Sequence, residues 1–192
     1  MDNPIDKFQH WWKAALHNSP LKQKSAICIS TIDADGFPSS RFADLKAVDP
    51  QGFTFCTYLD SAKGKHISQN PKIGLTVWWD HIGYQVRVLG IAKPIADADA
   101  VICWKTRSRD AQLTTTALEQ SQPLASEDEL RLKVEMVEKL YLDSEIPKPK
   151  NWGGYCITPI SIEFLTFKES RLHLREFYQK NESGWLKSLL QP

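Results

Sequence analysis

The chain of 192 residues has few cysteines and little net charge. Its four cysteines, Cys28, Cys56, Cys103 and Cys156, are widely scattered and include no C-x-x-C pair. Disulfide frameworks and metal sites usually show closer, patterned spacing, so we expect buried thiols in a reducing compartment. The formal net charge of +1 supplies no overall field that would attract nucleic acid or an acidic membrane.

Long apolar runs and several common catalytic motifs are also missing. No uninterrupted apolar run approaches the ~20 residues that cross a bilayer, and the N-terminal MDNPIDKFQHWW lacks the apolar stretch of a signal peptide. No G-x-G-x-x-G, G-x-S-x-G or H-E-x-x-H motif occurs, and the five histidines are not spaced as metal ligands. We therefore expect a cytoplasmic protein with no metal, no membrane partner and no nucleic-acid partner.

What the chain does contain is a series of short strands separated by turns. Strand patterns cover residues 26–32, 39–48, 53–58, 73–79 and 84–95, with turn signals at 33–36 and 49–52. Short turns join antiparallel strands, because parallel neighbours need long crossovers. Further strands are expected at 161–167, 171–178 and 185–190.

Helical patterns flank these strands. They cover residues 6–17, 61–69 with Ser61 or Asp60 as N-cap, 97–107, 112–120, and 126–141, which opens with the capping box Ser126-x-x-Glu129. The segment IPKPKNWGGY, residues 146–155, predicts a rigid connection. The sequence thus predicts one domain, residues 1–192, of mainly antiparallel β-structure with peripheral helices, in which residues 1–24 form an N-terminal helical segment.

Basic side chains gather near the C-terminus. In Ser170-Arg-Leu-His-Leu-Arg175 an extended backbone places Arg171, His173 and Arg175 on one face. Neighbouring basic side chains repel one another unless an anion lies against them. Two interpretations stay open for this segment: a solvated outer face, or the wall of an anion or cofactor site.

Further basic residues lie on earlier elements. Arg41 and Lys46 bracket one strand, and Ser61 and Lys63 open a helix, where free backbone N–H groups can hold a phosphate. Together with the C-terminal segment, these residues indicate a polyanionic ligand without identifying it.

The order of several motifs resembles that of the pyridoxamine 5′-phosphate oxidase family. These motifs are R-x-x-x-L-K (41–46), S-x-K-G-K (61–65), Q-V-R-V-x-G (85–90), R-x-R-x-x-Q (107–112), Gln120-Ser121, P-K-P-x-x-W-G-G-Y (147–155), I-E-F (162–164) and R-L-H-x-R (171–175). The resemblance covers nearly the whole chain from about Ser25, and W-G-G-Y followed by R-L-H-x-R is its most specific part. It implies an FMN-binding split β-barrel that acts as a homodimer.

The resemblance also implies a reaction and a set of site residues. The reaction is the oxidation of pyridoxamine or pyridoxine 5′-phosphate to pyridoxal 5′-phosphate by O2, which gives H2O2. The small phosphorylated pyridine would be bound by Lys46, Arg107, Arg171 and His173, of which Arg171 and His173 would be catalytic and orient the substrate for hydride transfer. FMN would be held by Arg41, Lys46, Thr57, Ser61, Lys63, Gln85, Gln120, Ser121 and Arg175.

Several positions depart from the family's pattern. Cys103 and Ala111 stand where the family has a tyrosine and a serine that bind the substrate phosphate, and Ala62, Leu165 and Leu174 replace an arginine, a tryptophan and an aspartate. Two alternatives therefore stay open: a related FMN oxidoreductase that acts on another reduced ring, as in phenazine biosynthesis, and a non-catalytic protein that binds a flavin or pyridoxal phosphate. We also expect the segment before Ser25 to close over the site as a lid.

Overall fold

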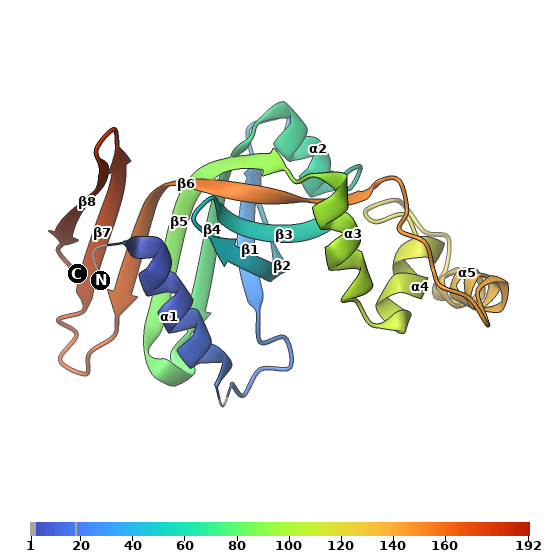
Figure 1. Cartoon of the computed structure of the whole chain (residues 1–192), viewed down its shortest axis with the longest axis horizontal. Coiled ribbons are helices and arrows are strands. Elements are labelled where there is room, and N and C mark those ends of the chain that lie inside the picture. The colour runs from blue at the N-terminus through green and yellow to red at the C-terminus, as the bar shows by residue number, and fades with distance from the viewer. Residues whose placement is uncertain (1–2, 18) are drawn as a thin grey trace.

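The computed structural model describes residues 3–17 and 19–192, and its centre is a barrel of antiparallel strands (Figure 1). In this part of the chain the barrel strands are β1 (Ala26–Ile32), β2 (Pro38–Asp49), β3 (Gly52–Tyr58), β4 (Lys72–Trp79), β5 (Tyr84–Pro94) and β6 (Trp152–Thr166). They are ordered β3-β2-β1-β4-β5-β6, and the pairing of β3 with β6 closes the barrel. The predicted fold class, mainly antiparallel β with peripheral helices, is confirmed.

The barrel is split because β6 changes partner along one edge. Residues 152–157 of β6 pair with β3, whereas residues 161–166 pair with β7 (Leu174–Asn181). Pro159, which has no backbone N–H to donate, lies between these two halves. Beyond it, β7 and β8 (Gly184–Leu190) form a hairpin that extends the sheet outside the barrel (Figure 1).

Two glycines permit the close approach of β3 and β6. A Cβ on Gly52, whose φ is +145°, would lie 2.0 Å from the carbonyl oxygen of Ile157. A Cβ on Gly154 would lie 2.6 Å from the carbonyl oxygen of Phe55. Since real Cβ atoms do not approach backbone oxygens so closely, both positions require glycine.

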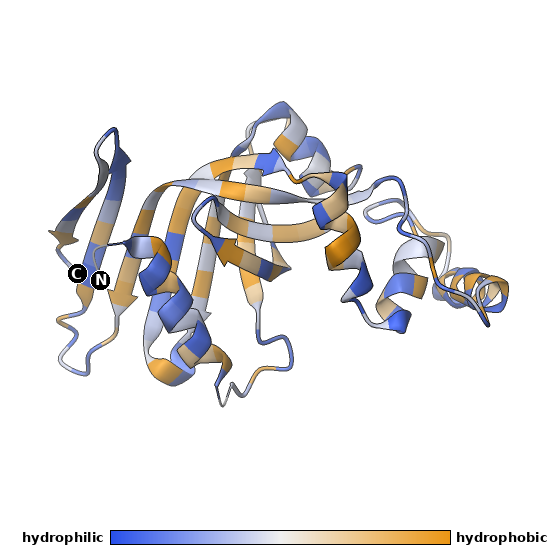
Figure 2. Cartoon of the chain, in the orientation of Figure 1, coloured by the Kyte–Doolittle hydropathy of each residue, from blue (hydrophilic) through white to orange (hydrophobic). Residues whose placement is uncertain are grey.

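Inward-facing apolar side chains fill the barrel, and Figure 2 shows hydrophobic and hydrophilic residues alternating along its strands. This alternation is expected where a strand has one buried face. The side chains that are at most 1% exposed include Ile27, Ile29, Phe53, Phe55, Val86, Ile157, Ile162 and Phe164.

Helix α1 (Pro4–Leu16) packs into this core. The Phe8 ring lies edge-on to Phe53 with centroids 4.8 Å apart, and Trp11 stacks on Tyr84 at 3.9 Å. Lys7 forms an ion pair with Glu176 of β7. Because this packing makes α1 part of the barrel core, it does not fit the expected role of a lid.

The remaining helices cover one end and one side of the barrel. Helix α2 (Ala62–Gln69) lies above the strands in Figure 1, the 3₁₀ turn η1 (Asp80–Ile82) joins β4 to β5, and α3 (Asp97–Lys105), α4 (Arg109–Ala117) and α5 (Glu127–Leu140) form a helical arm beside the barrel. The Ser126 hydroxyl caps α5 by accepting a hydrogen bond from the Glu129 N–H at 3.3 Å, as the capping box predicts. A second apolar cluster joins the arm to β3 and β6 and contains Tyr58, Ala100, Trp104, Leu113, Ile146 and Trp152.

Two element predictions are wrong. Residues 152–155, expected in a rigid connection, begin β6, which therefore starts at Trp152 and not at the predicted residue 161. The strand expected from residue 171 begins only at Leu174, and residues 167–173 form the connection between β6 and β7. The argument that an extended backbone places Arg171 and His173 on one face with Arg175 is therefore wrong.

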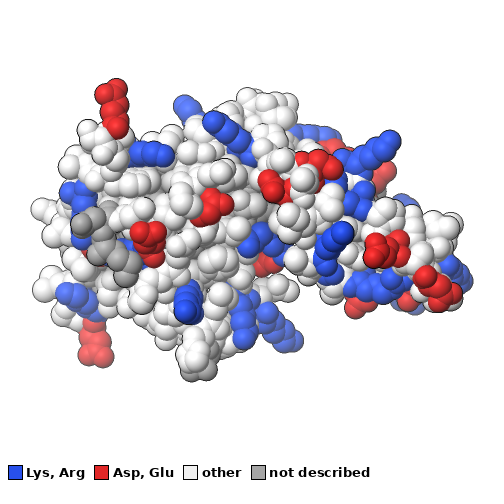
Figure 3. Space-filling view, in the orientation of Figure 1, with Lys and Arg blue, Asp and Glu red and all other residues white. Residues whose placement is uncertain are grey.

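Charge and hydropathy of the folded chain agree with the sequence analysis. Acidic and basic side chains are interspersed on the face shown in Figure 3. Among the described residues, no helix combines the length and the apolar character needed to cross a membrane. The cytoplasmic location stays a prediction.

Candidate active site

A buried lysine marks the first part of the site, at the N-terminus of α2. Ser61 is the N-cap of this helix, and its hydroxyl accepts a hydrogen bond from the Gly64 N–H at 3.4 Å. Lys63, only 8% exposed, donates from Nζ to Gln120 Oε1 at 2.6 Å, Thr57 Oγ1 at 3.0 Å and Ser61 Oγ at 3.3 Å. Burial, with a smaller contribution from Arg41, lowers the pKa of Lys63 to about 8.

Arg41 supplies a second cation next to Lys63. It projects from β2, and its guanidinium donates to Thr31 Oγ1 at 2.6 Å and to Ser39 Oγ at 2.7 Å. Burial lowers the pKa of Arg41 as well. In the described part of the chain neither Arg41 nor Lys63 has a carboxylate partner, and a buried cation is costly unless an anion compensates it. These two residues and the N-terminus of α2, which we call the anion cradle, therefore suit a phosphate group.

The loop after α4 completes the cradle. Gln120 bonds to Lys63, and the Ser121 hydroxyl accepts a hydrogen bond from the Ala62 N–H at 3.4 Å. Ser121 has a φ of +73°, a left-handed conformation that few non-glycine residues adopt. The structure thus brings together the predicted cofactor residues from β2, β3, α2 and this loop: Arg41, Thr57, Ser61, Lys63, Gln120 and Ser121.

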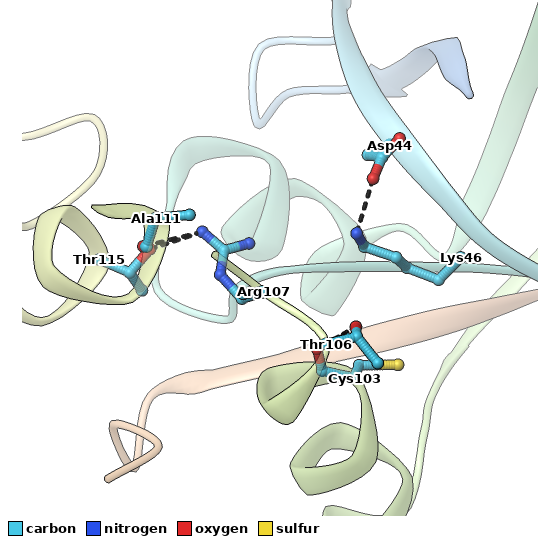
Figure 4. A network of polar contacts seen from close by, with 7 residues as sticks. All are labelled: Asp44, Lys46, Cys103, Thr106, Arg107, Ala111 and Thr115. Atoms are coloured by element: carbon cyan, nitrogen blue, oxygen red, sulfur yellow. Dashed lines mark hydrogen bonds and ion pairs between the residues drawn. The ribbon is translucent and has the colours of Figure 1, made fainter. Parts of the chain in front are cut away.

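A second pair of cations lies between β2 and the helical arm (Figure 4). Arg107, just after α3, donates to Thr115 Oγ1 at 2.9 Å and to the carbonyl oxygen of Ala111 at 3.1 Å. Its guanidinium lies 5.3 Å from the ring centroid of Trp152, and burial lowers its pKa. Lys46 donates to Asp44 Oδ2 at 2.6 Å. We call Lys46, Arg107 and their surroundings the substrate hollow.

The two parts of the site adjoin one another. A hollow of about 570 Å³ is lined by Tyr58, Arg107, Ala111, Thr115 and Gln120, among others, and Lys46 lies outside this lining. Because Gln120 also bonds to Lys63, this hollow opens beside the anion cradle.

Two neighbouring cysteines, Cys56 and Cys103, lie close to Lys46 and Arg107. Burial, followed by the effect of Cys103, raises the pKa of the Cys56 thiol to about 12, and the positive charges of Lys46 and Arg107 lower it by less. Cys56 therefore stays a neutral thiol at physiological pH and offers no charge to a ligand.

The other predicted cofactor residues lie on the outer face of the sheet. Gln85 of β5, Leu165 of β6 and Arg175 of β7 are cross-strand neighbours in one row. Arg175 donates from Nε to Glu163 Oε1 at 2.8 Å, and this hydrogen bond raises the pKa of Arg175. Among the described residues, no hydrogen bond or ion pair joins Gln85 or Arg175 to the anion cradle of the same chain.

Arg171 and His173 lie in the loop between β6 and β7. Arg171 is exposed and has a φ of +58°, and His173 Nδ1 accepts a hydrogen bond from the Lys168 N–H at 3.1 Å. The His173 ring lies edge-on to Phe167 with centroids 5.3 Å apart. Within the described part of a single chain, no contact brings either residue to Lys46 or Arg107.

The sequence analysis missed several polar partners of these cations, among them three side chains. Asp44 pairs with Lys46, Thr31 with Arg41, and Glu163 with Arg175. Two of them carried a signal in the sequence. Asp44 stands two residues before Lys46 on one strand and so shares its face. Thr31 follows Ile27 and Ile29 at two-residue spacing and so lies on the same buried face of β1.

Comparison with known proteins identifies the family. A family model described as pyridoxamine 5′-phosphate oxidase matches residues 15–141, and one described as the pyridoxine 5′-phosphate oxidase C-terminal dimerisation region matches residues 152–192. A protein of Idiomarina loihiensis named pyridoxine/pyridoxamine 5′-phosphate oxidase is 35% identical over 99% of this chain and 90% of that protein. A protein of the same name in Shewanella frigidimarina is 37% identical over 99% of this chain and 89% of that protein.

Solved structures agree in fold. PhzG from Burkholderia lata 383, in complex with tetrahydrophenazine-1-carboxylic acid, is 26% identical with a TM-score of 0.93, covering 100% of this chain and 94% of that one. A pyridoxamine 5′-phosphate oxidase-related, FMN-binding protein of Nostoc punctiforme is 18% identical with a TM-score of 0.78, covering 96% and 97%, and supports the fold alone. Since the two family models together cover the barrel, the arm and the C-terminal hairpin, this chain belongs to the pyridoxamine 5′-phosphate oxidase family, a family of oxidoreductases.

Proposed function

We propose that this protein is an FMN-dependent oxidase that converts pyridoxamine or pyridoxine 5′-phosphate to pyridoxal 5′-phosphate with O2, giving H2O2. The observation that carries the proposal is the anion cradle. It holds the buried cation Lys63 and the half-buried cation Arg41, whose hydrogen-bond partners are neutral throughout the described chain. A phosphate at a helix N-terminus compensates such charges, and family membership makes FMN the ligand of choice.

The residues of the cradle fit the phosphate end of FMN. Arg41, Lys63 and the first N–H groups of α2 would bind the phosphate, and Thr57, Gln120 and Ser121 would bond to its neighbouring polar groups. When bound, FMN supplies the redox chemistry by taking a hydride from the substrate, and O2 reoxidises it. The contribution of the protein is positioning and electrostatics.

The substrate hollow supplies the second anion site. Arg107 is held by Thr115 and lies over the face of Trp152, so its guanidinium is oriented before a ligand arrives. Lys46, which also served as a predicted cofactor residue, lies across from it (Figure 4). These cations would bind the phosphate of the substrate and place the ring beside the flavin.

The remaining site residues would act from a second copy of the chain. Gln85 and Arg175 would contact FMN, and Arg171 and His173 would lie over the substrate ring as the catalytic residues. The match to a dimerisation region over residues 152–192 supports a homodimer. So does the exposed Trp78, which pairs with Gln85 across β4 and β5 and is 64% exposed in the single chain.

Turnover under air tests the proposal. The purified protein is mixed with pyridoxamine 5′-phosphate while pyridoxal 5′-phosphate and peroxide are measured. Equal production of both supports the oxidase. A flavin-containing protein that forms neither product would favour one of the two alternatives, an oxidoreductase of another reduced ring or a non-catalytic binding protein.

One observation favours a second candidate, oxidation of a reduced ring that carries a carboxylate. The Asp44–Lys46 ion pair offsets one of the two positive charges beside the hollow, and Cys103 and Ala111 supply no side-chain hydroxyl. The structure with a TM-score of 0.93 is a PhzG protein that holds a tricyclic carboxylic acid.

The substitution Asp44→Asn tests the role of Lys46, and a comparison of two substrates separates the two candidates. It keeps the shape of the side chain and frees the charge of Lys46. For the phosphate substrate we expect the KM to fall about tenfold, because one opposing charge is removed. If the natural substrate carries a carboxylate, the wild-type protein will oxidise tetrahydrophenazine-1-carboxylic acid with the higher kcat/KM.

A further inference from the structure

Thr31 is a polar residue at a core position of β1. It shares the buried face of β1 with Ile27 and Ile29, and its side chain is 0% exposed. Its Oγ1 lies 2.6 Å from the guanidinium of Arg41, a residue of the neighbouring strand β2. The same Oγ1 lies 3.0 Å from Nδ1 of His66 on α2. The carbonyl oxygen of Ser39 is more distant, at 3.5 Å.

The chemistry of Arg41 fixes the direction of one of these hydrogen bonds. An arginine guanidinium only donates, so Thr31 Oγ1 accepts the bond from Arg41. The single hydroxyl proton of Thr31 is then free for another acceptor, and His66 Nδ1 is the nearer one. This arrangement corresponds to the His66 tautomer that accepts at Nδ1 and carries its ring proton at Nε2, and the direction of this bond depends on that tautomer.

This relay connects three elements of the anion cradle. Arg41 comes from β2, Thr31 from β1, and His66 from α2, whose N-terminus forms the cradle with Lys63. With Ser39 as its other partner, the guanidinium of Arg41 is held by two side-chain hydroxyls. The orientation of Arg41 thus depends on a hydroxyl whose own orientation depends on His66.

We infer that Thr31 and His66 are positioning residues for the phosphate of the flavin: His66 orients the Thr31 hydroxyl, and Thr31 orients Arg41 toward the phosphate. The inference rests on the proposed function, because it takes FMN as the ligand. Neither residue was predicted from the sequence. Both act through Arg41 rather than by contact with the phosphate.

Binding of two flavins to the flavin-free protein tests this role, because riboflavin lacks the phosphate of FMN. Thr31→Val removes the hydroxyl at nearly constant shape, and we expect it to weaken FMN about tenfold and to leave riboflavin binding unchanged. Thr31→Ser, which keeps the hydroxyl, is the matched control and retains FMN affinity. Quenching of flavin fluorescence gives the dissociation constants, and thermal unfolding of each flavin-free variant reports its folding.

Substitutions of His66 test the relay itself. His66→Leu removes the acceptor and is expected to weaken FMN about threefold to fivefold, while His66→Asn, whose Oδ1 replaces Nδ1, restores the affinity. In the Thr31→Val background His66→Leu has no further effect, because its target is gone.

The outcomes separate this inference from the proposed function. Equal weakening of FMN and riboflavin in Thr31→Val, or an undiminished effect of His66→Leu in the Thr31→Val background, overturns the positioning role. A wild-type protein that prefers FMN to riboflavin while Thr31→Val binds both normally overturns the inference alone. A wild-type protein that binds neither flavin overturns the proposed function.

Discussion

At the scale of single residues, the anion cradle depends on cations whose charge is not neutralised by a carboxylate of the described chain. Lys63 is the clearest case, because burial lowers its pKa to about 8 while its three hydrogen-bond partners are neutral. A bound phosphate favours the charged amine. FMN binding and protonation of Lys63 are therefore linked.

This linkage predicts a pH dependence of FMN affinity. Below pH about 8 the Lys63 amine of the flavin-free protein is charged and ready for phosphate; above it, binding must also take up a proton. We expect the affinity to fall by up to about tenfold per pH unit above pH 8. Titrations between pH 7 and 9 measure it, with riboflavin as the control ligand. Lys63→Met should bind FMN weakly at every pH, and a pH slope that persists in this variant would rule out Lys63 as its source.

Arg171 allows a substitution that removes the side chain without straining the backbone. Its φ of +58° suits glycine, so Arg171→Gly is expected to keep the melting temperature and the FMN content while lowering kcat/KM about a hundredfold. Lys168→Ala, in the same exposed loop, serves as the control and should retain activity, since only the backbone N–H of Lys168 bonds to His173. Unchanged turnover in Arg171→Gly would remove Arg171 from the catalytic residues.

At the scale of elements, closure of the barrel depends on the contact between β3 and β6. Gly52→Ala places a methyl group 2.0 Å from the Ile157 carbonyl oxygen at a φ of +145°, and we expect a loss of about 3 kcal/mol in the free energy of unfolding. Gly36→Ala, at a φ of +87° with nothing within 4 Å, should cost only about 1 kcal/mol. Denaturant unfolding measures both, and equal losses would mean that the close contact is unimportant.

The elements also show how far the sequence could predict this structure. The strands before residue 95 are formed by local alternation and short turns, and their expected bounds lie within one residue of the observed ones. The start of β6 was missed because Gly153, Gly154 and Pro159 have low strand propensity, and only pairing with β3 and β5 holds them extended. The spacing argument for Arg171 and His173 failed for a related reason, since a turn at residue 171 interrupts the alternation.

For the site, the anion cradle could be predicted from the resemblance and from the capped helix at Ser61. Its supporting residues Thr31 and His66 could not, because Thr31 reaches Arg41 and His66 reaches Thr31 only once β1, β2 and α2 are packed together.

At the scale of the whole molecule, two features await measurement. The assignment of residues 1–192 to one domain stays a prediction, supported by Tyr58 of β3 and Trp152 of β6, which belong to the apolar cluster of the arm. The second feature is the proposed homodimer. Gln85 and Arg175 lie on the outer face of the sheet, where they would contact the FMN of a second copy of the chain.

Disruption of that face should separate the subunits and release the flavin. Trp78, the cross-strand neighbour of Gln85, is 64% exposed in the single chain, and Trp78→Glu replaces this apolar surface with a charge. We expect the mass of the variant protein in light scattering to be half that of the wild type. Met136→Glu, on an exposed position of α5 in the arm, is the matched control and should stay dimeric. A Trp78→Glu dimer that retains FMN would contradict the proposed location of the interface.

The most direct test of the central claim, an FMN-dependent oxidase, is the visible spectrum of the purified protein during a single turnover. Pyridoxamine 5′-phosphate is added without oxygen, and air is then admitted. We expect the absorbance band of oxidised FMN to bleach on addition of the substrate, with one pyridoxal 5′-phosphate formed per flavin, and to return with air. A flavin band that does not change on addition of pyridoxamine 5′-phosphate would contradict the proposed reaction, and a protein that cannot be loaded with FMN would contradict the claim as a whole.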